Sequence, residues 1–143
     1  MRIERSLGEL AAAHRLMNYN GSCELLHGHN WAIDVWLDSD VDPTSGISID
    51  FLALEDFWKQ LRDQFDHGIW LNRADPLIQV LENNDVHMKL TRVDGEPTAE
   101  NVAALISNLL AEAFPEANAC GVRVGEMRGC SAETSLVLNA TES

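Results

Sequence analysis

The chain has 143 residues, 45% of them hydrophobic, and a formal net charge of −13 from 23 acidic and 10 basic residues. This composition excludes a disordered chain, and the length predicts one domain spanning residues 1–143. No basic footprint of a nucleic-acid-binding protein is present, and no apolar run approaches the roughly 20 residues of a membrane-spanning helix.

Most of residues 1–16 are expected to form a first strand, which a loop at 17–28 follows. Residues 29–38 alternate between apolar and polar side chains, which predicts a second strand. Residues 47–49 alternate again after several turn-forming residues, so 29–49 is interpreted as a hairpin. Asp50 is expected to cap a helix that ends near residue 66, because apolar residues recur there at three- and four-residue spacing.

In the second half, residues 77–81 predict a short helix and 86–93 an extra strand. Thr98 is expected to be the N-cap of a second long helix, with Pro97 at its boundary and Pro115 at its exit. Residues 119–127 and 133–139 predict two final strands. The order of main elements is therefore ββααββ, an α+β fold with two helices on one face of an antiparallel four-stranded sheet.

Three of the five histidines lie before residue 30. His27 and His29 flank one glycine. His29 is two residues before Trp31, so its side chain is expected on the apolar face of the second strand. A polar ring on that face needs a partner, and a metal ion supplies one. With His14 just upstream, the sequence offers three imidazole ligands for a cation such as zinc, Zn²⁺.

Cys23 leaves two interpretations open. Three imidazoles leave zinc one free position, which is typical of a catalytic site, whereas Cys23 as a fourth ligand makes a closed structural site. If Cys23 does not bind the metal, its thiol is a candidate base or nucleophile beside a cation. Spacing alone does not decide between them.

Two further groups are candidates for chemistry. Asp66 and His67 place a carboxylate beside an imidazole, but they are also compatible with an ordinary polar helix end. Glu126 lies in a predicted strand, where it either binds a substrate through both carboxylate oxygens or is simply solvated. The basic residues available for an anionic substrate are Arg15, Lys59, Arg62 and Arg128, and the sequence does not choose among them.

Taken together, these residues resemble the 6-pyruvoyl-tetrahydropterin synthase family, and most closely its 6-carboxy-5,6,7,8-tetrahydropterin synthase branch. The three residues between Cys23 and His27 favour that branch, because the pyruvoyl branch typically has a longer gap. The segment 77–96 is longer than in compact members. The matching motifs are Ala12-Ala13-His14-Arg15-Leu16, Cys23-x-x-x-His27-Gly28-His29-Asn30, Gly46-x-x-x-Asp50-Phe51, Leu61 to Asp66-His67, Leu71-Asn72, Pro97-Thr98-Ala99-Glu100-Asn101 and Val122 to Glu126.

The resemblance implies a tunnelling fold (T-fold) whose subunits assemble into a homo-oligomer, often a hexamer of two stacked trimers, with active sites at subunit interfaces. It implies that zinc is bound by His14, His27 and His29, and that Cys23 is the catalytic base. It also implies that Asp66 and His67 work with Cys23. Glu126 is implied to anchor the pterin ring, and Thr98 to be a further pterin contact.

The family substrate is 7,8-dihydroneopterin triphosphate. Enzymes of the carboxy branch are lyases that convert it to 6-carboxy-5,6,7,8-tetrahydropterin, acetaldehyde and triphosphate. Their product is used in 7-deazaguanine and queuosine biosynthesis. A pyruvoyl-type synthase, or a side-chain lyase in biopterin or folate synthesis, is the alternative within the class. A non-catalytic, zinc-stabilised assembly module is the alternative from another class. Because the N-terminus lacks the apolar core of a signal peptide and the three cysteines do not suggest disulfides, the expected location is cytoplasmic, with no membrane or nucleic-acid partner.

Overall fold

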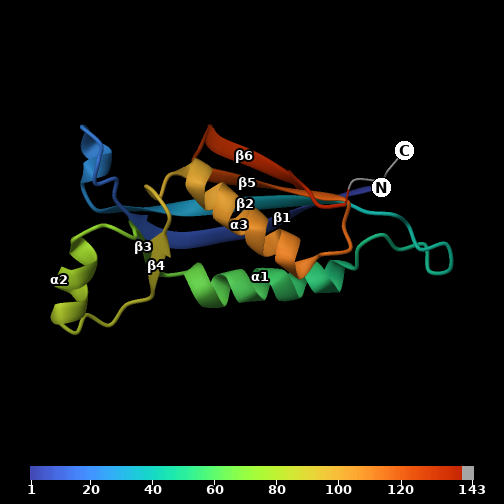
Figure 1. Ribbon diagram of the computed structural model, residues 1–143, viewed down its shortest axis with the longest axis horizontal. Coiled ribbons are helices and arrows are strands. Elements are labelled where there is room, and N and C mark those ends of the chain that lie inside the picture. The colour runs from blue at the N-terminus through green and yellow to red at the C-terminus, as the bar shows by residue number, and fades with distance from the viewer. Residues whose placement is uncertain (140–143) are drawn as a thin grey trace.

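A six-stranded sheet forms the body of the protein in the computed structural model, which describes residues 1–139 (Figure 1). Three α-helices and one short 3-10 helix complete the fold, and within residues 1–139 no helix combines the length and apolarity needed to cross a membrane. The strands are β1 (Arg2–His14), β2 (His27–Asp38), β3 (Gly68–Asn72), β4 (Leu90–Val93), β5 (Ala119–Met127) and β6 (Cys130–Val137), and the helices are η1 (Ser22–Glu24), α1 (Phe51–Phe65), α2 (Leu77–Asn83) and α3 (Ala99–Ala113).

The α+β class and the four main strands are confirmed, but the sheet has six strands where four were expected. The strand order is β4-β3-β1-β2-β5-β6, and β3 and β4 extend the sheet in parallel with β1. The strand β3 was missed because four of its five residues are buried, so it shows no alternation of apolar and polar side chains. Of the strand expected at 86–93, only Leu90–Val93 forms.

The hairpin expected over 29–49 is also wrong. Both edges of β2 are already paired, one with β1 and the other with β5, so no edge is free for a return strand. Residues 39–50 form a loop instead. Within it the Asp42 carboxylate accepts hydrogen bonds from the Thr44 backbone N–H at 2.9 Å and from the Ser45 hydroxyl at 2.8 Å, an arrangement that stabilises a turn.

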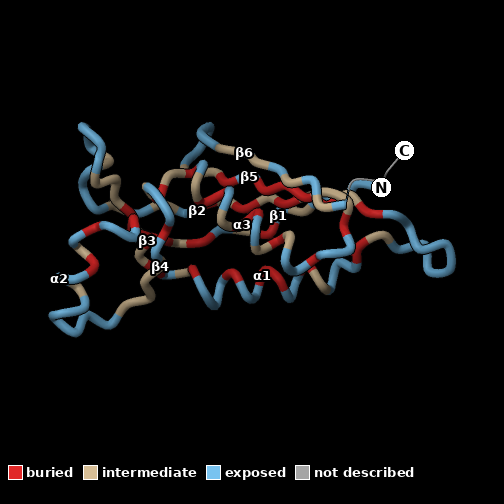
Figure 2. Tube along the Cα trace, in the orientation of Figure 1, coloured by how far each residue is buried: buried red, intermediate tan, exposed pale blue. Residues whose placement is uncertain are grey.

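The helices α1 and α3 cover one face of the sheet, and the core lies between (Figure 2). Both helices begin at their expected caps: the Asp50 carboxylate accepts from the Leu52 N–H at 2.8 Å, and the Thr98 hydroxyl from the Asn101 N–H at 3.3 Å. On β2, every second residue from Trp31 to Leu37 is buried against the helices. The predicted period of two therefore decides which side chains enter the core.

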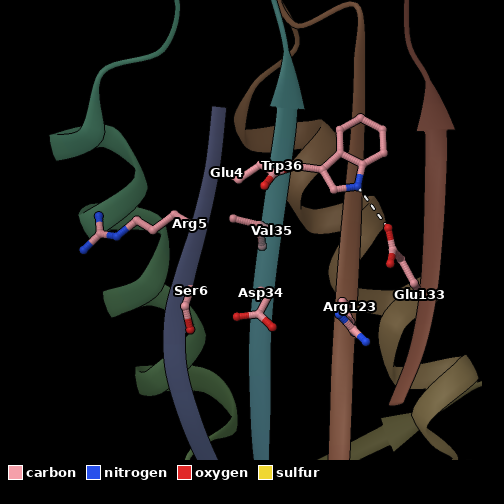
Figure 3. Close-up of a pocket in the computed structure, with 8 residues that line it drawn as sticks. All are labelled: Glu4, Arg5, Ser6, Asp34, Val35, Trp36, Arg123 and Glu133. Atoms are coloured by element: carbon pink, nitrogen blue, oxygen red, sulfur yellow. Dashed lines mark hydrogen bonds between the residues drawn. The ribbon is translucent and has the colours of Figure 1, made fainter. Parts of the chain in front are cut away.

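Within residues 1–139, the opposite face of the sheet carries no helix. Figure 3 shows its polar side chains on β1, β2, β5 and β6, including Asp34, Arg123 and Glu133, around an open hollow. Trp36 lies on this face, where its indole N–H donates to Glu133 at 3.3 Å. Its ring covers Gly121, at which any side chain would lie within 2.3 Å of the indole.

One end of the elongated molecule gathers the segments that bear on function. The loop joining β1 to β2, with η1, lies at this end together with α2, whereas the N-terminus and the loop at 39–50 lie at the other (Figure 1). The last residues of β1 and the first of β2 therefore bring the histidine-rich segments of the sequence to a single place.

Candidate metal centre and active site

The pairing of β1 with β2 assembles the three histidines. In the antiparallel register His14 lies opposite His27, and Ala12 lies opposite His29. Because side chains alternate along a strand, the three imidazoles share the face that α1 and α3 cover. His14 is 1% exposed, and Trp31, which is fully buried, packs against the rings of His14 and His29.

Two of these rings have their protonation fixed by the backbone. His14 Nδ1 lies 2.7 Å from the Pro97 carbonyl oxygen, and His27 Nδ1 lies 2.6 Å from that of Leu25. A carbonyl oxygen only accepts, so each Nδ1 carries a proton, and in the neutral ring the lone pair is then on Nε2. The two Nε2 atoms face one another at 3.1 Å. Two lone pairs this close repel each other, and a cation bound between them would relieve the repulsion.

His29 and Glu126 complete a group of four possible ligands. His29 Nε2 is buried without a hydrogen bond, although Glu126 Oε1 lies 3.1 Å away, outside hydrogen-bonding geometry. The four candidate ligand atoms all lie within 4.8 Å of one another. Ligands bound at about 2.0–2.1 Å in a tetrahedron are separated by roughly 3.4 Å. The His14–His27 and His29–Glu126 pairs, each at 3.1 Å, are close to that separation, and the His14–Glu126 pair at 3.9 Å is wider.

The electrostatics of His14 favour the ligand form. Burial lowers the pKa of His14, and the neighbouring imidazoles His27 and His29 act in the same direction. The hydrogen bond to Pro97 and the charge of Glu126 oppose this shift without reversing it. A lowered pKa keeps the ring neutral at physiological pH, which is the state that binds a metal ion.

Cys23 is not part of this group. It lies in η1 and is partly exposed, and among residues 1–139 the cluster of close ligand atoms contains Glu126 in its place. The Cys23 carbonyl accepts from the Leu16 N–H at 2.9 Å, which returns the loop to the end of β1. The geometry therefore favours an oxygen ligand over a thiolate beside the three imidazoles.

Asp66 and His67 form a pair at the end of α1. One Asp66 oxygen accepts from the Ala11 N–H at 2.8 Å, and the other lies 3.0 Å from His67 Nδ1. Burial raises the pKa of Asp66, but these hydrogen bonds and the His67 charge outweigh it and lower the pKa overall. His67 has a φ of 57°, a left-handed conformation that costs about 1 kcal/mol or more and is often found at functional positions.

The His67 side chain is 83% exposed and lines an open hollow with Ala11, Ala13 and Asn30. Side chains at these positions of β1 and β2 point away from the face that carries the metal ligands. His29 of the histidine cluster lines the same hollow, but among residues 1–139 no hydrogen bond joins the Asp66–His67 pair to the cluster.

Thr98 and the basic residues have other partners. Thr98 caps α3 beside Pro97, the residue that accepts from His14. Arg15 is fully engaged by Asp75, with Nε 2.8 Å from Oδ2 and an Nη 2.5 Å from Oδ1. Other basic residues border open hollows: Lys59, Arg62 and Lys89 lie near His67, and Arg128 lies in the β5–β6 turn.

Asp75 is a structural residue that no local pattern in the sequence singled out. Its side chain is fully buried, and besides binding Arg15 it accepts from the Leu77 N–H at 2.8 Å at the start of α2. The hydrogen bond from Arg15 lowers the pKa of Asp75, and it outweighs burial, which acts the other way. Asp75 thus connects α2 to the residue that follows His14.

Replacement of Asp75 by asparagine is expected to lower the free energy of unfolding by about 2 kcal/mol at pH 7, since it removes hydrogen bonds between charged groups. Because the folded pKa is below the ordinary value of 3.8, the contribution of Asp75 is full above that value and is lost as pH falls below it. Urea unfolding between pH 3 and 7 should therefore show a weaker acid dependence in the variant. Glu82→Gln, which removes an exposed pair with Arg92, should match the wild type at every pH.

The family model described as 6-pyruvoyl tetrahydropterin synthase matches residues 3–136. A 6-carboxy-5,6,7,8-tetrahydropterin synthase of Rickettsia conorii is 30% identical over 109 residues, which cover 76% of this chain and 77% of that protein. A probable 6-carboxy-5,6,7,8-tetrahydropterin synthase of Halobacterium salinarum is 28% identical over 121 residues, 82% of this chain and 75% of that protein.

Solved structures confirm the tunnelling fold. The 6-pyruvoyl tetrahydropterin synthase of Plasmodium vivax superposes with a TM-score of 0.75 at 18% identity, over 96% of this chain and 98% of that one. The enzyme of the same name from Caenorhabditis elegans gives 0.67 at 25% identity, over 94% of both chains. These similarities agree with the resemblance drawn from the sequence motifs.

Proposed function

Because the chain belongs to the 6-pyruvoyl tetrahydropterin synthase family, we propose that it is a zinc-dependent lyase of the carboxy branch. It converts 7,8-dihydroneopterin triphosphate to 6-carboxy-5,6,7,8-tetrahydropterin, acetaldehyde and triphosphate, in the cytoplasm and on the route to 7-deazaguanines and queuosine. The observation that carries the proposal is the convergence of His14 and His27, whose Nε2 lone pairs are 3.1 Å apart, with His29. The carboxy names of the sequence relatives support the branch.

In this proposal His14, His27 and His29 hold the zinc ion. When bound, zinc supplies Lewis acidity at a hydroxyl or carbonyl of the substrate side chain. The carbonyls of Pro97 and Leu25 orient two of the ligand rings and select the tautomer whose Nε2 faces the metal site. Trp31 seals the inner side of the site from water, since it is fully buried against the rings.

Cys23 is the proposed base, which removes a proton from the substrate side chain. Its partial exposure and its separation from the ligand cluster support this role, because the thiol is free to approach a substrate. Asp66 and His67 are proposed to accept and stabilise the proton during turnover. The Asp66 hydrogen bonds keep that residue ionised, so it can stabilise a protonated His67.

We further propose that the active site is completed between subunits of a homo-oligomer, a hexamer of two trimers. The support is the exposure of His67, whose side chain is 83% exposed and makes no hydrogen bond to the histidine cluster within residues 1–139. A pair so exposed is accessible to a neighbouring copy of the chain.

Glu126 is proposed to bind the pterin ring, with Thr98 nearby, although its carboxylate also lies within reach of the metal site. Replacement of Glu126 by glutamine separates the two roles, because the amide cannot accept two hydrogen bonds from the pterin ring through both of its terminal atoms. As a pterin anchor, the variant should show KM raised about tenfold or more with an unchanged zinc content. A fall in zinc affinity measured by competition with a chelator would instead make Glu126 a ligand.

Mass analysis of the products tests the function. Zinc-loaded protein is incubated with 7,8-dihydroneopterin triphosphate, and the expected products are 6-carboxy-5,6,7,8-tetrahydropterin and acetaldehyde. A product that keeps all side-chain carbons assigns the chain to the pyruvoyl type, and a cleaved side chain without the carboxy group assigns it to a side-chain lyase. Zinc binding without any turnover indicates a structural module.

A further inference from the structure

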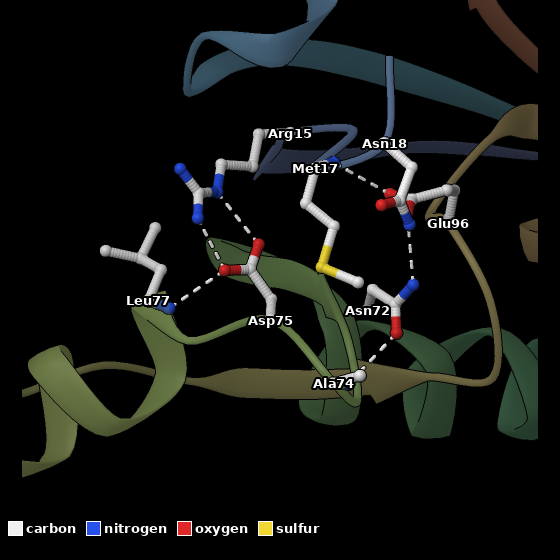
Figure 4. Close-up of polar contacts among 8 residues, drawn as sticks. All are labelled: Arg15, Met17, Asn18, Asn72, Ala74, Asp75, Leu77 and Glu96. Atoms are coloured by element: carbon white, nitrogen blue, oxygen red, sulfur yellow. Dashed lines mark hydrogen bonds and ion pairs between the residues drawn. The ribbon is translucent and has the colours of Figure 1, made fainter.

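Glu96 is bound to three donors from two distant segments. Its Oε2 accepts from the Met17 N–H at 2.9 Å, and its Oε1 accepts from the side-chain amides of Asn18 at 2.7 Å and Asn72 at 3.1 Å (Figure 4). Met17 and Asn18 belong to the segment between β1 and β2 that carries Cys23, here called the Cys23 loop and defined as residues 15–26. Asn72 is the last residue of β3.

A short series of backbone contacts leads from Glu96 to Cys23. Met17, held by Glu96, follows Leu16, whose N–H donates to the Cys23 carbonyl at 2.9 Å. On the other side, the carbonyl of Pro97 accepts from His14 Nδ1 at 2.7 Å. The neighbouring residues Glu96 and Pro97 thus hold the loop of the thiol and a ligand of the metal centre at once.

Packing alone does not hold the Cys23 loop. Residues 18–22 are exposed, and so are Leu25 and Leu26, which are 70% and 49% exposed. A segment with few buried apolar contacts opens at low free energy unless polar contacts hold it. Beyond the Arg15–Asp75 pair at its start and the contact of His27 Nδ1 with the Leu25 carbonyl at its end, the side-chain hydrogen bonds between this loop and the rest of residues 1–139 converge on Glu96.

We propose that Glu96 is a positioning residue that sets the place of Cys23 relative to the metal ligand His14. The proposal rests on the proposed function in one respect, the role of Cys23 as the base. Glu96 has no direct contact with Cys23 and acts through Met17, Leu16 and the loop backbone. Its carboxylate suits the task because it is an acceptor only and receives donors on both oxygens.

The test compares Glu96→Gln with Asp94→Asn. The glutamine side chain keeps the size of Glu96 but turns one acceptor into an NH₂ donor, so at least one of the N–H donors loses its partner. Asp94→Asn removes the same charge two residues away, where Asp94 makes an exposed pair with Arg73. Both proteins are prepared with zinc and compared with the wild type.

Iodoacetamide alkylation, followed by peptide mass analysis, reports Cys23 separately from the exposed Cys130. In Glu96→Gln the alkylation rate of Cys23 should rise about tenfold, since a hydrogen bond to a charged group is lost, and hydrogen exchange at Leu16 and Met17 should accelerate similarly. Zinc content should stay at the wild-type level, and kcat should fall about tenfold with KM nearly unchanged. Asp94→Asn should behave as the wild type throughout.

An unchanged alkylation rate and unchanged exchange in Glu96→Gln overturn the proposal. So does a loosened loop with full turnover, because Glu96 then holds the loop without any catalytic consequence. If the wild type itself shows no pterin turnover, the proposed function fails, while alkylation and exchange still decide whether Glu96 positions the loop. Asn18→Ala, which removes one exposed donor, provides a milder variant and should shift both rates in the same direction if Glu96→Gln does not fold.

Discussion

Replacement of Cys23 by alanine is expected to lower turnover of the pterin substrate by about 10²–10⁴-fold, the contribution of a positioned base, while zinc content stays the same. Zinc content should stay the same because the thiol is not among the four candidate ligand atoms, which lie within 4.8 Å of one another. Thermal unfolding should also be nearly unchanged, since Cys23 is partly exposed and the backbone bond from Leu16 does not use its side chain.

Cys130→Ala is the matched control for this prediction. Cys130 is an exposed free thiol at the start of β6, outside the ligand cluster, so turnover and zinc content should both equal those of the wild type. Loss of zinc together with activity in Cys23→Ala would contradict the assignment and make the thiol a ligand of a closed site.

Replacement of His27 by alanine is expected to remove zinc and activity together. The variant leaves two imidazoles and one carboxylate as candidate metal ligands. The Leu25 carbonyl also loses its hydrogen bond from His27 Nδ1, which is 2.6 Å long in the wild type. Because binding of a metal ion to the folded state stabilises it, the variant should also lose the rise in melting temperature that zinc gives the wild type. Zinc per chain is measured by elemental analysis after dialysis.

His87→Ala is the control for this second prediction, because His87 is exposed and lies outside the cluster of ligand atoms. It should keep zinc, activity and the zinc-dependent rise in melting temperature. If His27→Ala retains a full complement of zinc and turns over substrate, the three-histidine centre is wrong.

Local patterns in the sequence predicted much of the fold. The alternation after His29, the apolar spacing before Phe65 and the caps Asp50 and Thr98 each report on neighbouring residues, and the structure confirms them. The strand β3 and the failed pairing of residues 47–49 depend instead on which sheet edges are free. That property belongs to the whole chain and leaves no local signal.

The candidate site divides in the same way. His14, His27 and His29 stand close in the sequence, and the β1–β2 register places them side by side. The approach of Glu126 to His29 depends on the pairing of β2 with β5 across about ninety residues of sequence, which no local pattern encodes. Likewise, Glu96 reaches Met17 from 79 residues away, so its part in holding the Cys23 loop became visible only in the folded chain.

X-ray absorption at the zinc edge of the metal-loaded protein tests most directly the division between a histidine metal centre and a free thiol. A centre of histidines and oxygen donors should give nitrogen and oxygen ligands at about 2.0–2.1 Å, with no sulfur shell. The same spectrum should be obtained from Cys23→Ala. A zinc–sulfur distance of about 2.3 Å in the wild type, lost in Cys23→Ala, would contradict the account, because Cys23 would then be a ligand and not the base.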